Sequence, residues 1–191
     1  MTDQITTHRL TPARLQDYLK FFDHDAFTDN PHWASCYCYF NQAPHHEKDW
    51  HARDAAENRA GATGLIEQRK LRGYLAYLDG NVIGWCNVNV VSSYTTFDEG
   101  DAFPPGDKIA VIACFVVAPQ YRKRGVARNL LDAAIDGLTR EGMESIYVIT
   151  QRDTDKDTEN LHGPLKIYLD AGFEIVQERP PLVQVRKMLR P

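Results

Sequence analysis

The stretch from Lys108 to Gly142 constrains the fold of this chain most strongly. Ten apolar residues in a row precede Pro119, which lacks a backbone N–H donor and therefore ends a strand. A short basic segment follows, and apolar side chains then recur every fourth residue, at Val126, Leu130, Ala134 and Leu138. Because this spacing places them on one face of a helix, we predict a buried strand, a loop and an amphipathic helix that Gly142 caps.

The loop between this strand and this helix is suited to bind a phosphate group. A helix N-terminus leaves several backbone N–H groups unpaired, and the helix dipole adds about half a positive charge there. Gly125 allows a positive φ and a close approach of a ligand to the backbone. Arg122, Lys123 and Arg124 add side-chain charge. We therefore predict a phosphate or pyrophosphate site, with a solvated basic corner as the alternative.

Two segments resemble the GNAT superfamily of N-acetyltransferases. Residues 122–127, Arg-Lys-Arg-Gly-Val-Ala, resemble its acetyl-CoA signature Q/R-x-x-G-x-G/A, and they match neither the dinucleotide-binding nor the P-loop pattern. Residues 167–173, Ile-Tyr-Leu-Asp-Ala-Gly-Phe, resemble the end of a second GNAT motif. The start of that motif differs from the family pattern. Asn160 lies one residue too far from Tyr168, and Pro164 stands where the family has an alanine. Together the matches cover residues 72 to 190.

The bulk properties fit one domain of residues 1–191 in a reducing cytoplasm. The net charge of −4 argues against nonspecific nucleic-acid binding, and no apolar stretch approaches the ~20 residues that span a bilayer. The N-terminus lacks the basic and apolar segments of a signal peptide. Four cysteines in 191 residues do not form a disulfide framework.

The resemblance implies an α/β (α+β) fold: a mixed, mostly antiparallel twisted sheet flanked by helices, with a splayed central pair of parallel strands. The residue pattern adds local detail. Asp79-Gly80 predicts a tight hairpin between two strands. Residues 47–60 predict a helix that Gly61 and Gly64 interrupt.

The resemblance also implies transfer of an acetyl group from acetyl-CoA, as cosubstrate, to a primary amine of a small molecule or peptide. Tyr168 matches the tyrosine that protonates the leaving thiolate in many relatives. The positions that match cofactor-binding residues are the strand residues Phe115, Val116 and Val117, acting through main chain, the loop residues Arg122, Lys123, Arg124, Gly125, Val126 and Ala127, and Asn160.

The base that accepts the amine proton is not evident from the sequence. Glu99, Asp101 and His162 are candidates by location, and a water relay is an alternative. Cys114 is either an acyl nucleophile or a small buried hydrophobe. In the GNAT layout, the aromatic segment of residues 29–46 falls where acceptor substrates are often bound, and it predicts an acceptor pocket.

Two functions from other classes stay open. The missing base suits a non-catalytic sensor that binds acyl-CoA. A metal-binding module could use Cys36, Cys38, His45 and His46, but one residue separates the cysteines where zinc sites have about two to four. We therefore expect no metal. The expected partner is the acceptor amine, without nucleic acid or membrane, and the expected assembly is a monomer or homodimer.

Overall fold

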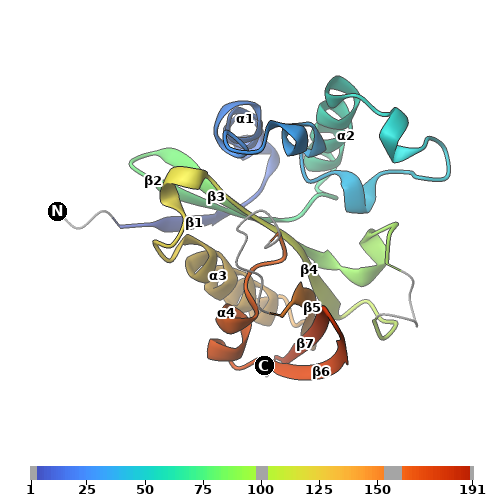
Figure 1. Cartoon of the computed structure of the whole chain (residues 1–191), viewed down its shortest axis with the longest axis vertical. Coiled ribbons are helices and arrows are strands. Elements are labelled where there is room, and N and C mark those ends of the chain that lie inside the picture. The colour runs from blue at the N-terminus through green and yellow to red at the C-terminus, as the bar shows by residue number, and fades with distance from the viewer. Residues whose placement is uncertain (1–3, 98–102, 153–160, 190–191) are drawn as a thin grey trace.

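A central sheet of seven strands organises the molecule. The computed structural model describes residues 4–97, 103–152 and 161–189. The strand order is β1-β2-β3-β4-β5-β7-β6, and every neighbouring pair is antiparallel except β4 and β5 (Figure 1). The strands are β1 (Thr6–Arg9), β2 (Gly73–Leu78), β3 (Asn81–Val90), β4 (Ile109–Val117), β5 (Ser145–Gln151), β6 (Glu174–Arg179) and β7 (Leu182–Met188).

Helices cover both faces of this sheet and confirm the expected fold class. The helices α1 and α2 lie on one side, and α3 and α4 lie on the other (Figure 1). Their bounds are α1 (Leu15–Lys20), α2 (Ala55–Glu67), α3 (Val126–Arg140) and α4 (Leu165–Asp170). In the part of the chain that the structure describes, no helix has the length and apolar character that crossing a membrane requires.

Each face of the sheet has its own hydrophobic core. On the α3 side, the helix presents Leu130, Leu131 and Ala134, which are fully buried, as its spacing of apolar residues predicts. On the α1 side, the Trp85 ring is fully buried and meets the Tyr18 ring edge-on, with 5.1 Å between centroids. These two cores fix the sheet from both sides and hold the strand ends that form the site.

The parallel pair β4 and β5 separates after a few residues, which confirms the expected splay. Pairing joins only Ile109–Val111 to Ser145–Tyr147, although both strands continue beyond it. Past this point Phe115 donates its backbone N–H to the Leu161 carbonyl over 2.6 Å instead of to β5. The segment of residues 161–163 therefore occupies the opening between the two strands.

The predicted helix of residues 47–60 is wrong in its bounds. Helix α2 begins at Ala55, because Asp54 and Glu57 form a reciprocal capping box with bonds of 2.8 and 2.9 Å. It also continues through both glycines. A Cβ on Gly61 would lie 2.4 Å from the Tyr39 ring, so this glycine lets the ring pack against the helix.

The other predicted elements are confirmed. The hairpin turn has Asp79 and Gly80 at φ values of 48° and 78°, as the tight turn requires. Helix α3 begins directly after Gly125, and Gly142 follows its end at a φ of 73°.

Candidate functional site

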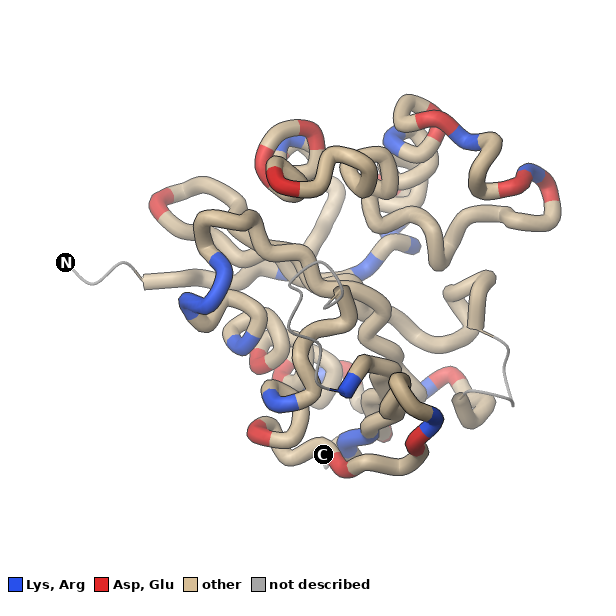
Figure 2. The backbone as a smooth tube through the Cα atoms, viewed as in Figure 1, with Lys and Arg blue, Asp and Glu red and all other residues tan. Residues whose placement is uncertain are grey.

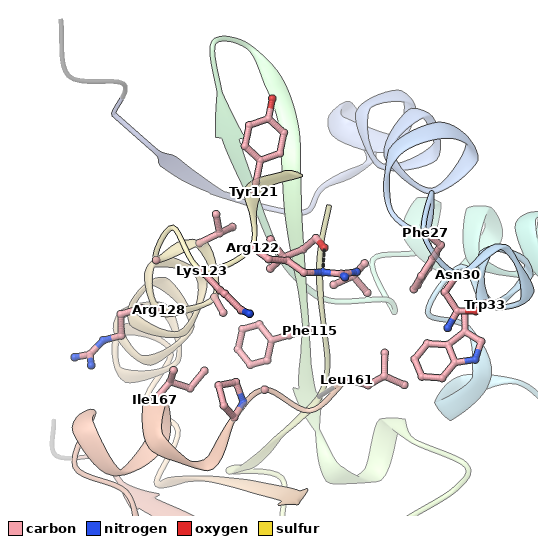
Figure 3. Close-up of a pocket in the computed structure, with 17 residues that line it drawn as sticks. Phe27, Asn30, Trp33, Phe115, Tyr121, Arg122, Lys123, Arg128, Leu161 and Ile167 are labelled. Atoms are coloured by element: carbon pink, nitrogen blue, oxygen red, sulfur yellow. Dashed lines mark hydrogen bonds between the residues drawn. The ribbon is translucent and has the colours of Figure 1, made fainter. Parts of the chain in front are cut away.

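The first cavity, cavity 1, opens at the splayed end of β4 and has a volume of about 260 Å³. The strand end, the loop before α3 and the segment of residues 161–164 form its walls. Figure 3 shows Phe115 and Lys123 on one side of it, with Phe27 and Trp33 on the other. Most predicted cofactor-binding residues line it, namely Phe115, Val116, Val117, Arg122, Lys123, Gly125, Val126 and Ala127.

The basic loop, residues 122–127, forms the end of cavity 1, and its first half is blue in Figure 2. Lys123 and Gly125 both adopt positive φ, at 59° and 81°. No side chain caps the N-terminus of α3, and its first turn contains no acidic residue. A Cβ placed on Gly125 would find no atom nearer than 3.9 Å, so the glycine leaves open space above the backbone. These features suit a bound anion.

Arg122 connects the basic loop to the N-terminal part of the chain. Its guanidinium contacts both carboxylate oxygens of Asp29, over 2.5 and 3.2 Å, and its Nε donates to the Val117 carbonyl over 3.2 Å (Figure 3). The hydrogen bond from Arg122 lowers the pKa of the Asp29 carboxyl. Arg124 instead lies over the Tyr121 ring, 5.6 Å from its centroid, and does not line cavity 1.

Tyr168 lies behind the wall of cavity 1. Its side chain is fully buried, and its hydroxyl donates to the His162 carbonyl. A Cβ on Gly163, which lines the cavity, would lie 3.1 Å from this hydroxyl oxygen. Burial raises the pKa of Tyr168 well above its ordinary value, so the phenol is protonated at neutral pH. Asn160, Glu99 and Asp101 lie outside the described residues.

A second cavity, cavity 2, adjoins the first and has a volume of about 570 Å³. It shares part of its wall with cavity 1, through Phe27, Trp33, Val116 and Leu161. The aromatic segment of residues 29–46 supplies several of its lining residues, so this segment does form a pocket wall. Six lining residues are Phe or Trp, namely Phe22, Phe27, Trp33, Phe40, Trp50 and Phe97. None of the described lining residues is Asp, Glu, Lys or Arg.

A left-handed turn carries Cys38 to the wall of cavity 2. Tyr37 and Cys38 have φ values of 46° and 49°, which non-glycine residues adopt only when their surroundings hold them. The Tyr37 hydroxyl donates to Asp23 over 2.8 Å, and Arg59 binds the same carboxylate through two nitrogens. These bonds hold the turn, and the one from Arg59 is the main cause of the lowered pKa of Asp23.

Three of the four cysteines line cavity 2, and all four are free thiols. Cys38 and Cys114 are hydrogen-bonded, which lowers the pKa of Cys38 and raises that of Cys114. Burial raises the pKa of Cys36 to about 11. The fourth, Cys86, is fully buried in the core.

The metal-binding alternative lacks support in the described residues, where no three His, Cys, Asp or Glu side chains gather as a metal site. Cys36 and Cys38 face cavity 2, whereas the His45 ring bonds the Phe40 carbonyl over 2.7 Å. The His46 Nε2 lies 3.6 Å from the Glu47 Oε1.

Sequence reasoning missed most of the residues that join the two cavities, although Trp33 lies in the aromatic segment that predicts an acceptor pocket. Phe27 and Trp33 line both cavities, and Asp29 pairs with Arg122 across 93 residues of sequence. Thr96 and Phe97 complete cavity 2 from the loop after β3. Only the aromatic content of residues 29–46 signalled any of these positions.

Comparisons with known proteins identify a matching family and similar structures. A family model described as "Acetyltransferase (GNAT) family" matches residues 30–163. No curated protein matches the chain. Among solved structures, a GCN5-related N-acetyltransferase from Kribbella flavida is similar with a TM-score of 0.60 and 20% identity, covering 97% of this chain and 98% of that one.

Two further structures share the fold at lower identity. The PaiA N-acetyltransferase from Thermoplasma acidophilum, solved with coenzyme A, has a TM-score of 0.56 and 13% identity over 97% of this chain and 99% of that one. The ribosomal-protein-S18-alanine N-acetyltransferase from Escherichia coli has a TM-score of 0.54 and 13% identity over 98% and 96%. The family match covers well over half of the chain, and the splayed sheet and the basic loop agree with it: this chain belongs to the acetyltransferase (GNAT) family.

Proposed function

We propose that this protein is an acetyl-CoA-dependent N-acetyltransferase that acetylates a primary amine of a small molecule or peptide. The observation that carries the proposal is the meeting of two cavities at the splay of β4 and β5. Cavity 1 ends at a loop built for an anion, and cavity 2 has an aromatic wall. A donor and an acceptor can therefore approach each other where the two cavities meet.

The residues of cavity 1 fit a bound coenzyme A. The uncapped N-terminus of α3 and the open space over Gly125 would receive the pyrophosphate. Phe115 and Val117 lie on the splayed edge of β4, where the Phe115 N–H and the Val117 carbonyl are already bonded by Leu161 and Arg122. The remaining main-chain groups of this edge are the proposed contacts of the pantetheine amides. Val116 pairs with Trp85 of β3 and offers its side chain to the cavity.

Acetyl-CoA, when bound, supplies an acetyl thioester that is reactive toward an amine. Tyr168 is the proposed proton donor to the departing sulfur, because its protonated hydroxyl lies behind Gly163 on the wall of cavity 1. The same apolar surroundings disfavour a free thiolate, which favours its protonation.

The acceptor is proposed to bind in cavity 2 with an apolar or aromatic body. Phenylalanine and tryptophan rings dominate the wall, and burying such a body against them stabilises the complex through the hydrophobic effect. The E. coli relative acts on a ribosomal protein, which keeps a peptide amine among the candidates.

A panel of amines and peptides with acetyl-CoA, read by release of free thiol, tests the proposal. Arylalkylamines and peptides with aromatic N-terminal residues are expected to release thiol faster than polyamines or aminoglycosides. Binding of coenzyme A with no transfer to any amine would favour the acyl-CoA sensor instead. Absence of coenzyme A binding would reject both functions.

A further inference from the structure

The segment of residues 161–163 is held rigidly in the opening between β4 and β5. Three successive carbonyls accept hydrogen bonds: Leu161 from the Phe115 N–H over 2.6 Å, His162 from the Tyr168 hydroxyl, and Gly163 from the Thr150 hydroxyl over 2.5 Å. These donors come from β4, β5 and α4. The backbone on both sides of His162 is therefore fixed at the point where the two cavities meet.

The His162 side chain faces cavity 2, whereas Gly163 beside it lines cavity 1. The imidazole is hydrogen-bonded to the backbone carbonyl of Ala113. Ala113 is the residue that the β3–β4 register skips, between Ile112 and Cys114, and it lies past the end of the β4–β5 pairing. The Ala113 carbonyl accepts a hydrogen bond from the N–H of one ring nitrogen, so the other ring nitrogen is free to act as an acceptor.

We propose that His162 is the general base that takes the proton of the acceptor amine, which rests on the proposed acetyl transfer. In this step the amine nitrogen bonds to the acetyl carbonyl carbon and the bond from that carbon to sulfur breaks. His162 takes the amine proton, and the sulfur takes a proton from Tyr168. Exchange with water then restores both side chains, so one proton leaves the amine and one joins the thiol.

The charge state of His162 suits this role. Burial lowers the pKa of the imidazole, so the ring is neutral at pH 7 and can accept a proton. The other titratable side chains on the described wall of cavity 2 are His32, Cys36, Cys38 and Cys114. Tyr168 contacts the segment from α4. Cys36 and Cys114 have raised pKa values and stay as neutral thiols.

Replacing His162 tests the proposal through turnover and its pH dependence. With the best amine of the panel, His162→Gln is expected to lower kcat by about 100-fold while coenzyme A affinity stays within twofold. Since the base acts when neutral, wild-type kcat should fall as pH drops through a value below the ordinary ~6.5 of histidine. The control variant His8→Gln, at a histidine that lines neither cavity, should keep this acid limb, and His162→Gln should lose it.

A second readout does not depend on turnover. Side-chain NMR of histidine-labelled protein, titrated with pH, should contain one resonance that His162→Gln removes and that titrates below ~6.5. A His162 that titrates at or above this value, or a His162→Gln enzyme with kcat within threefold of wild type, would overturn the assignment. Those results would leave the proposed function intact, because it depends separately on coenzyme A binding and thiol release.

Discussion

At the scale of single residues, the geometry allows two roles for Tyr168. Its hydroxyl is bonded to the His162 carbonyl and lies behind Gly163, so it is either a proton donor to the thiolate or a support for the His162 segment. Both roles use the same atom, but only the first one acts on the reacting sulfur.

We expect Tyr168→Phe to lower kcat by roughly 100-fold while acetyl-CoA still binds, because only the hydroxyl is removed. Steady-state kinetics and a thermal melt measure the two effects. Tyr94→Phe is the matched control, since Tyr94 is also a buried tyrosine whose hydroxyl bonds a backbone carbonyl, that of Val111. It should lower the melting temperature similarly and leave kcat unchanged. A Tyr168→Phe enzyme with kcat within threefold of wild type would remove Tyr168 from the chemistry.

At the residue level, a site could be predicted from sequence where a short local motif carries the signal. The loop of residues 122–127 needed only its own charges, its glycine and the following helix to indicate an anion site. It did not reveal that Arg122 is paired with Asp29, because that contact depends on how distant segments pack. His162 was one of three candidates by location, and only the fold shows its ring on the wall of cavity 2.

At the scale of elements, α2 shows where sequence reasoning failed and why. Two glycines indicated a broken helix, because glycine is unfavourable in helix interiors. The helix continues because its start is fixed by the Asp54–Glu57 capping box and because Gly61 leaves room for the Tyr39 ring. Gly64 has no such contact, since a Cβ there would find its nearest atom at 4.0 Å.

The two glycines of α2 should therefore respond oppositely to alanine. We expect Gly61→Ala to destabilise the protein by about 1–3 kcal/mol, because the Tyr39 ring must move. Gly64→Ala should stabilise it by about 0.5–1 kcal/mol, since alanine is the better helix former. Denaturant unfolding of both variants measures the free energies. Equal effects of the two substitutions would show that packing of Tyr39 against Gly61 does not matter.

At the scale of the whole molecule, the sheet could be predicted, whereas for cavity 2 the sequence indicated only the wall that residues 29–46 form. Strand periodicity and hairpin signals predicted individual strands, because each depends on local sequence, and the GNAT resemblance implied the mixed sheet and its splayed pair. Cavity 2 assembles from Phe22 and Phe27 after α1, the aromatic segment, the loop after β3, β4 and the segment of residues 161–163. Side chains so far apart in sequence meet only through tertiary packing, which local patterns in a single sequence do not show.

The central claim is that the basic loop before α3 holds the pyrophosphate of coenzyme A, and calorimetric titration tests it most directly. Gly125 and Gly142 flank α3 at its two ends, both with positive φ and with room for a Cβ. Gly125→Asp should weaken coenzyme A binding at least tenfold, about 1.4 kcal/mol, because a carboxylate then faces the phosphates. Gly142→Asp carries the same backbone strain and charge and should bind as wild type does. Equal affinities for all three proteins, or no binding by the wild type, would contradict the account.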